Sequence, residues 1–158
     1  MILDLYTSTA VRDGRVAAAA VIRDAEGRTL RVTARSLEGT SREEAAYRAL
    51  LHGLWRARRM GARRVRVYCG DATVLAQLEG EIEVPVELVG VYLQTRAMLN
   101  AYRWSSVELV QRDRNAEASL ASVDALDREP DSRGFEIEEI EAMPLWEQAG
   151  RERVGTSR

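Results

Sequence analysis

The chain has 158 residues, 46% of them hydrophobic, and carries 23 basic against 25 acidic residues for a formal net charge of −2. This length favours a single domain with its own core over a disordered chain. No apolar run approaches the roughly 20 residues of a membrane-spanning helix, and the N-terminus lacks the charged-then-apolar order of a signal peptide. We therefore expect a cytoplasmic protein with no membrane partner.

The types of basic residue, the distribution of charge and the single cysteine further limit what kind of protein this sequence encodes. All 23 basic residues are arginine, which codon bias explains more simply than selection for phosphate binding does. Residues 124–158 hold ten acids and five arginines, so we expect a nearly neutral folded part and an acidic end. Cys69 is the only cysteine. An internal disulfide is thus excluded. We expect Cys69 to lie in a strand, which favours a role as a small buried hydrophobic residue.

The first part of the chain is predicted to form three strands, at residues 2–7, 16–23 and 29–36. Turn sequences, Asp13-Gly14 and Glu26-Gly27, separate them. Strands joined by tight turns form an antiparallel meander. The run of alanine and valine in the second strand suits burial on both faces.

A helix follows, and it begins with a capping box. Ser41 lies three residues before Glu44, so that each side chain can satisfy a free N–H group of the first turn. One face of the helix is apolar, at Tyr47, Leu50, Leu51 and Leu54, which predicts burial of that side alone. Gly61 ends the helix.

The rest of the chain alternates between strands and helices. We predict a strand at 64–68, a short helix ending at Gly80, a helix at 87–102, a strand at 104–110 and a last helix at 115–126. In the last helix we expect Ala116, Leu120 and Val123 to form the buried side. The order βββαβααβα predicts an α/β fold, a five-stranded mixed sheet with helices on both faces.

Four stretches in this order resemble a known family. They are VAAAAVIRDAEG, EAAYRALLHGL, VYCGDATVLAQLEGEIEV and RDRNAEASLA. The second and fourth are similar to NNEAEYEAL and RxxNAEADxLA of the short bacterial and archaeal type-1 ribonuclease H domains. The resemblance covers nearly all of residues 1–126, and it implies the ribonuclease H-like fold.

The resemblance also implies a chemistry. These enzymes cut the RNA strand of an RNA–DNA hybrid by attack of water at phosphorus, with two Mg²⁺ ions beside the reacting oxygens. Such ions need several converging carboxylates. Counted without gaps, the four family positions are occupied here by Ser8, Ala46, Gly70 and Ser119, so every carboxylate is replaced.

Two neighbouring acids are the residual candidates. Asp71 follows Gly70, and a one-residue deletion after the GDA sequence would make it the family aspartate. Glu43 lies three residues before Ala46, close to the same helix face. Our main hypothesis is a module that has lost metal-dependent cleavage, has no cofactor, and binds nucleic acid or protein. The alternative is an active Mg²⁺-dependent ribonuclease H that uses shifted carboxylates.

Candidate contacts to nucleic acid lie on the main helix. The resemblance places Ser41 and Arg42 where the family touches the minor groove of the hybrid, although Ser41 is better explained as a helix cap. The outer stripe of this helix holds Arg48, His52, Arg56 and Arg59. We expect it to be mainly a solvated face, with His52 as a surface histidine. Three aromatic residues are expected to face the core: Trp55, Tyr68 and Trp104.

The predicted domain spans residues 1–126, and residues 127–158 form an acidic C-terminal extension. Glu-Pro-Asp-Ser-Arg-Gly is a linker sequence, and FEIEEIEAMPLW alternates apolar and acidic residues. We expect this extension to dock back on the domain. It remains open whether it instead stays disordered or binds another protein or a second copy of the chain.

Overall fold

The computed structural model describes residues 1–130 and 134–135. Its elements are β1 (Ile2–Arg12), β2 (Arg15–Arg23), β3 (Thr29–Leu37), α1 (Arg42–Arg59), β4 (Arg64–Cys69), α2 (Ala72–Leu78), α3 (Val89–Ala101), β5 (Trp104–Leu109) and α4 (Ala116–Leu126). Two short 3₁₀ helices, η1 (Val86–Leu88) and η2 (Arg112–Arg114), precede α3 and α4. The predicted order of strands and helices is confirmed.

The five strands form one mixed sheet in the order β3-β2-β1-β4-β5. The β1–β2 and β2–β3 pairs are antiparallel, whereas β1–β4 and β4–β5 are parallel. β1 runs five residues past the expected end at Thr7, because its hairpin with β2 stays paired up to Arg12 and Arg15. Asp13 and Gly14, with φ of 53° and 74°, make the left-handed turn that such a hairpin requires.

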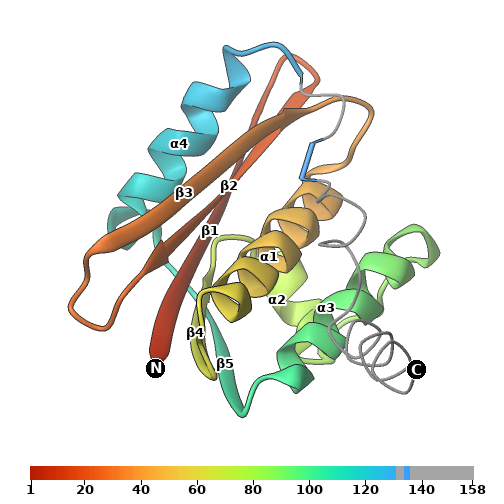
Figure 1. Cartoon of the computed structure of the whole chain (residues 1–158). Helices are drawn as coiled ribbons and strands as arrows, with labels where there is room; N and C mark the ends of the chain where they lie inside the picture. Colours follow the sequence, from red (N-terminus) through yellow and green to blue (C-terminus); the bar gives the residue numbers. More distant parts are fainter. Residues whose placement is uncertain (131–133, 136–158) are drawn as a thin grey trace, which may run out of the picture.

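Helices cover both faces of the sheet, with α1 and α4 on opposite sides (Figure 1). On the α1 side the main core joins Tyr47, Leu50 and Leu54 to Leu5 of β1 and Val67 of β4. The predicted buried face of the main helix is therefore confirmed. β2 is buried along its whole apolar run from Val16 to Ile22, as predicted for a central strand.

The buried side of α4 differs from the prediction. Leu120 is 64% exposed and Val123 45% exposed, whereas the buried residues are Ala118, Ser122, Ala125 and Leu126. Ala125 and Leu126 pack on alanines of β2 and β3. Because the helix lies close to a sheet surface made of alanine, small side chains fit along most of this contact, and the one large side chain buried in it, Leu126, lies at the end of the helix.

Two other predicted burials are corrected or refined. Trp104 is 45% exposed, because it begins the edge strand β5, whereas Trp55 is buried as expected. His52 is not a freely exposed surface residue. Its Nε2 lies 3.3 Å from Thr33 Oγ1, and its ring lies 5.6 Å from that of Phe135.

The described part of the C-terminal extension touches the domain. Phe135 is buried with Val16, Leu37 and Ala49, so this residue of the extension lies against the α1 side of the sheet. Residues 136–158, on which the expectation of docking depends, lie outside the described residues. Among the helices that the structure describes, none combines the length and the apolar character needed to cross a bilayer.

Candidate functional site

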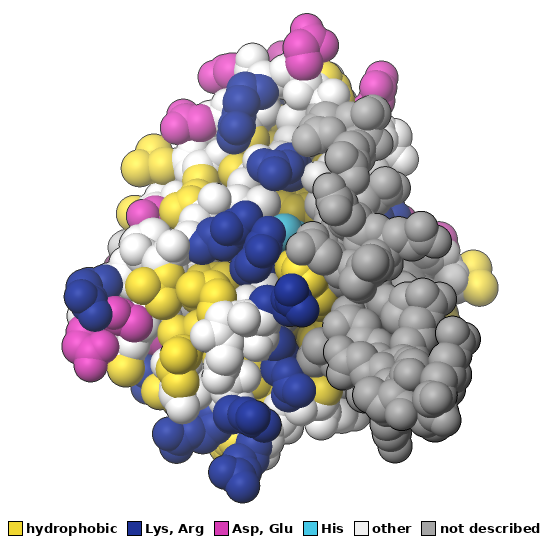
Figure 2. Space-filling view, viewed as in Figure 1, with side chains coloured by type: hydrophobic (Ala, Val, Ile, Leu, Met, Phe, Trp, Pro, Cys, Tyr) yellow, Lys and Arg dark blue, Asp and Glu magenta, His cyan; other side chains and the backbone are white. Residues whose placement is uncertain are grey.

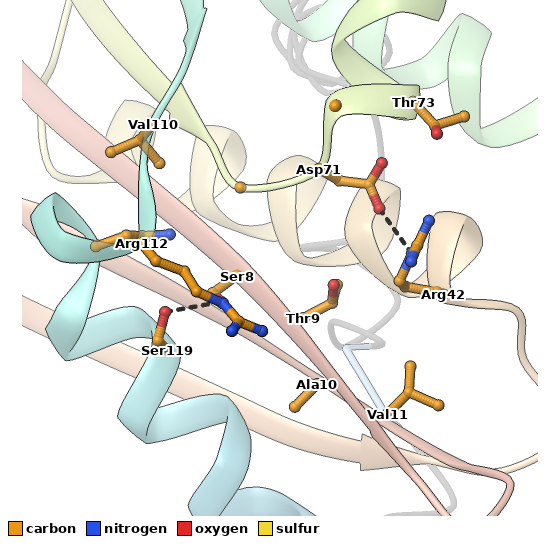
Figure 3. Close-up of a pocket in the computed structure, with 13 residues that line it drawn as sticks. Ser8, Thr9, Ala10, Val11, Arg42, Asp71, Thr73, Val110, Arg112 and Ser119 are labelled. Carbon is orange, nitrogen blue, oxygen red and sulfur yellow. Dashed lines mark hydrogen bonds and ion pairs between the residues drawn. The ribbon is translucent and has the colours of Figure 1, made fainter.

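The first turns of α1, α2 and α4 meet the middle of β1 around a pocket of about 440 Å³. Figure 3 shows the residues that line it. Three kinds of side chain matter in its lining: the hydroxyls of Ser8, Thr9, Thr73 and Ser119, the carboxylate of Asp71, and the guanidinium groups of Arg42 and Arg112. The parallel pairing of β1 with β4 stops here, at Tyr6 and Tyr68, and β4 ends at Cys69, so the loop and the helix starts that follow can place polar groups together.

Two of the family positions lie side by side in this pocket. Ser8 Oγ and Ser119 Oγ are 3.3 Å apart, although the residues are 111 positions apart in sequence. Ser8 comes from β1, and Ser119 comes from the first turn of α4. The fold therefore brings the middle of β1 and the start of α4 to one point, and it places two neutral hydroxyls there.

The strand end at Gly70 has no room for a side chain. A Cβ at residue 70 would lie 2.4 Å from the Thr7 carbonyl oxygen and 3.1 Å from Asn115 Nδ2. Asn115 Nδ2 itself donates to Thr7 O at 2.8 Å, so the two segments are tied together across this point. A carboxylate can therefore enter the pocket from residue 71 but not from residue 70.

Asp71 is the carboxylate that the structure places in the pocket. It is 6% exposed and is the N-cap of α2, because its Oδ1 accepts the Val74 N–H at 3.0 Å. Its other oxygen, Oδ2, lies 3.3 Å from Arg42 Nε. One oxygen of Asp71 thus holds the backbone, and the other pairs with a cation of the same chain.

Arg42 reaches this carboxylate from the first turn of α1. It lies one turn before Ala46, so the two residues share a helix face. Ala46 itself is buried in the main core and does not line the pocket. The side chain of Arg42 is 50% exposed, and its Nη2 also lies 3.3 Å from Glu43 Oε1.

The other acids near the family positions do not line the pocket. The described contact of the Glu43 carboxylate is with Arg42. Glu117, two residues before Ser119, accepts from Thr29 Oγ1 at 2.7 Å and from Arg23 Nη2 at 2.9 Å. These bonds, the one from Thr29 first, lower the pKa of Glu117. Glu117 therefore ties α4 to the β2–β3 hairpin.

The residues present do not fit a pair of Mg²⁺ ions. Over residues 1–130 and 134–135, no three His, Cys, Asp or Glu side chains converge, whereas Mg²⁺ takes near-octahedral oxygen ligation with carboxylates. The pocket offers one carboxylate, and an arginine already pairs with it.

Of the two predicted nucleic-acid contacts, only Arg42 lines the pocket. Ser41 Oγ accepts the Glu44 N–H at 3.1 Å, so Ser41 caps α1 as expected. The reciprocal half of the capping box is replaced, since the Glu44 carboxylate lies 3.7 Å from Arg48 Nε.

The outer stripe of α1 forms a basic band on the surface. Its residues are Arg48, His52, Arg56 and Arg59. Figure 2 shows arginine side chains gathered around the single histidine on this face. Arg56 and Arg59 lie over the ring of Trp55, at 5.1 and 5.7 Å from its centroid. Burial first, and then the charges of Arg56, Arg31 and Arg35, lower the pKa of His52 to about 4. This band is separate from the pocket lining.

Arg112 is a pocket residue that our sequence analysis did not identify. Its side chain points into the pocket (Figure 3), and its guanidinium makes no ion pair or hydrogen bond within the described part of the chain. The signal was the first letter of RxxNAEADxLA, which Arg112 matches in RDRNAEASLA. It was missed because a pattern of letters does not say which side chain turns inward.

The sheet order, the parallel and antiparallel pairs, and the covering helices define a ribonuclease H-like domain. The model of the reverse transcriptase-like family matches residues 6–125. The chain therefore belongs to this family. A comparison with curated proteins found no match.

Solved structures of ribonucleases H are similar to this one. The N-terminal RNase H domain of a Mycobacterium tuberculosis protein is 26% identical, with a TM-score of 0.74, and the match covers 80% of this chain and 94% of that one. RNase H1 from the archaeon Halobacterium salinarum NRC-1 is 22% identical, also with a TM-score of 0.74, over 80% and 98%. An RNase H1 from compost, solved in complex with an RNA/DNA hybrid, is 21% identical with a TM-score of 0.71 over 79% and 96%.

Proposed function

We propose that this protein is a ribonuclease H-like module that binds nucleic acid duplexes and has lost metal-dependent cleavage. The observation that carries the proposal is the chemistry of the pocket. Ser8 and Ser119 meet where the resemblance calls for two carboxylates, and the one carboxylate present, Asp71, pairs with Arg42. A two-metal reaction needs a cluster of anionic oxygens to hold both ions, and this donor set does not supply one.

Asp71, rather than residue 70, is the counterpart of the family aspartate in this proposal. The close approach of Gly70 to Thr7 supports it, as does the position of Asp71 in the pocket lining. One of four carboxylates then persists. Its retention is explained without catalysis, because Asp71 caps α2 and pairs with Arg42.

Duplex nucleic acid is the proposed partner because of what similar proteins bind. The compost RNase H1 was solved with an RNA/DNA hybrid, and a foamy viral protease-reverse transcriptase of similar fold was solved with double-stranded DNA. The pocket lining adds two arginines against one aspartate, which suits a phosphate backbone.

The test combines cleavage and binding. A labelled RNA–DNA hybrid is incubated with the protein in Mg²⁺ or Mn²⁺, and the same duplex is used in gel shifts at increasing salt. We expect an uncut hybrid and binding that weakens steeply with salt. Cleavage that disappears in Asp71→Asn would establish the active-enzyme alternative. Absence of both cleavage and binding would overturn the nucleic-acid proposal and favour a protein partner or a homodimer.

A further inference from the structure

The ion pair between Arg42 and Asp71 sets a cation in the lining of the pocket. Asp71 is 6% exposed, and a buried carboxylate holds its partner firmly because an unpaired charge there is costly. Arg42 is half-exposed and lines the pocket, so its guanidinium remains accessible to solvent. The geometry is that of an arginine held at its Nε by a buried anion, with Nη2 beside Glu43 and with Nη1 making no contact to an acid within the described residues.

We propose that Arg42, held by Asp71, binds a nucleic-acid backbone phosphate in this pocket and does so without a divalent ion. This inference rests on the proposed function and names the residue and the charge that take the place of the family's metal ions. A guanidinium carries five N–H donors in a planar fork that matches two phosphate oxygens. Asp71 lies at Nε and Glu43 Oε1 lies 3.3 Å from Nη2, which leaves Nη1 for the first contact with the ligand.

The groups around Arg42 suit an anion. Arg112 adds a second guanidinium from η2, and Ser8, Thr9 and Ser119 add hydroxyl donors to the lining. Four carboxylates in the same space would repel a phosphate unless metal ions lay between them. Here the lining carries one more positive than negative charge, so no bridging ion is needed. Glu43, which contacts Arg42 from outside the lining, carries a charge that opposes binding.

Two longer helices also begin at this pocket. Arg42 is the first residue of α1, and Asn115 and Ser119 belong to the start of α4. Asn115 makes no side-chain hydrogen bond to the first turn of α4, because its amide donates to Thr7 instead. The free N–H groups and the dipole of such a helix start favour an anion.

The test uses paired substitutions that leave the net charge of the protein unchanged. Arg42→Gln/Asp71→Asn removes the pair in the pocket, and asparagine can still cap α2. Arg48→Gln/Glu44→Gln is the matched control, since it removes an ion pair of the same helix, at 3.7 Å, that does not line the pocket. Binding of a short RNA–DNA hybrid is measured over a salt series, in EDTA and in Mg²⁺ at equal ionic strength.

We expect the pocket variant to bind about tenfold more weakly, the loss typical of one charged hydrogen-bonded contact. The slope of log K against log salt should fall by about one, because one phosphate contact is gone. The control and the wild type should share one slope, and EDTA should change neither. Thermal unfolding of each variant verifies that it is folded.

Each contrary result has its own meaning. A pocket variant that binds like the control would overturn the role of Arg42 and leave duplex binding intact. Wild-type binding that needs Mg²⁺ would overturn the metal-free mode. A wild type that binds no duplex at any salt concentration would overturn the proposed function itself, and the inference with it.

Discussion

Gly70 shows how a single residue sets the shape of the pocket. A Cβ there would lie 2.4 Å from the backbone oxygen of Thr7, and a backbone atom cannot rotate away as a side chain can. Gly70→Ala should therefore lower the free energy of unfolding by about 1–3 kcal/mol, the usual cost of overpacking. Urea unfolding measures the change.

The matched control is Gly90→Ala. Gly90 lies in the first turn of α3 and has nothing within 4 Å of its Cβ position, so alanine there should raise stability by up to about 0.5–1 kcal/mol through helix propensity. If both variants were equally stable, the strands would have moved apart at Gly70, and an aspartate at residue 70 would be sterically possible.

The pKa of His52 reports on the contact between this residue and Phe135 of the C-terminal extension. Its pKa is lowered to about 4, first by burial and then by neighbouring arginines. The folded protein therefore takes up the proton less readily than the unfolded chain, in which the imidazole pKa is about 6.5. The burial of neutral His52 therefore leaves the free energy of unfolding undiminished above pH 6.5. The free energy of unfolding decreases as the pH falls from 6.5 towards 4, because the unfolded chain then binds the proton more tightly than the folded protein does.

The single histidine gives one NMR titration to follow. We expect its midpoint near pH 4 in the wild type and a shift towards 6.5 in Phe135→Ala, because the ring of Phe135 packs beside the imidazole, with the ring centroids 5.6 Å apart, and its removal would expose the imidazole to water. Leu120→Ala, an exposed change on α4, is the control and should leave the midpoint unchanged. A wild-type midpoint of 6.5 would show that His52 is solvated.

Among the elements of the fold, the start of α1 allows a structural role of Ser41 to be tested separately from a role in binding. Ser41 accepts the Glu44 N–H, so Ser41→Ala should cost about 1 kcal/mol of stability, while Ser41→Asn, which can cap, should cost much less. Neither change should alter duplex affinity in gel shifts, because the hydroxyl is already engaged. Loss of affinity in both variants, without loss of stability, would instead make Ser41 a ligand contact.

Sequence patterns predicted the elements well where burial is one-sided. The apolar period of α1, the alternation in β4 and the glycine turns follow from local physics, so these elements lie where they were expected. The buried side of α4 was predicted wrongly because the surface on which this helix packs was unknown. Only the fold shows that it rests on the alanines of β2 and β3, so that Ala118, Ser122, Ala125 and Leu126 are buried while Leu120 points outward.

At the scale of the whole molecule, the site depends on contacts that sequence spacing does not reveal. The positions of Ser8 and Ser119 could be proposed from the family pattern, yet their contact joins β1 to α4. The Arg42–Asp71 pair joins two helices, and no local pattern predicts it. Counting along the sequence without gaps also assigns the family aspartate to position 70. Spacing alone does not show that the backbone of Thr7 leaves no room for a side chain there.

The last prediction concerns all four family positions at once. A variant with Ser8→Asp, Ala46→Glu, Ser119→Asp and Arg42→Asn would set three new carboxylates beside Asp71 and remove the internal cation. Without metal it should be less stable than the wild type, because like charges repel and the glutamate replaces a buried alanine. Mn²⁺ should restore stability, by about 2.7 kcal/mol at 100 times Kd.

Thermal unfolding with and without Mn²⁺ checks this, with the same variant carrying Asp71→Asn as the control. Stabilisation by Mn²⁺ that is lost in the control would mean that Asp71 belongs to the rebuilt carboxylate cluster. For a chain of this size, 2.7 kcal/mol corresponds to a rise of about 5–10 °C in Tm. The wild type should show no such rise. If Mn²⁺ stabilised it equally, Arg42 would not stand in for the metal, and the pocket would still be a metal site.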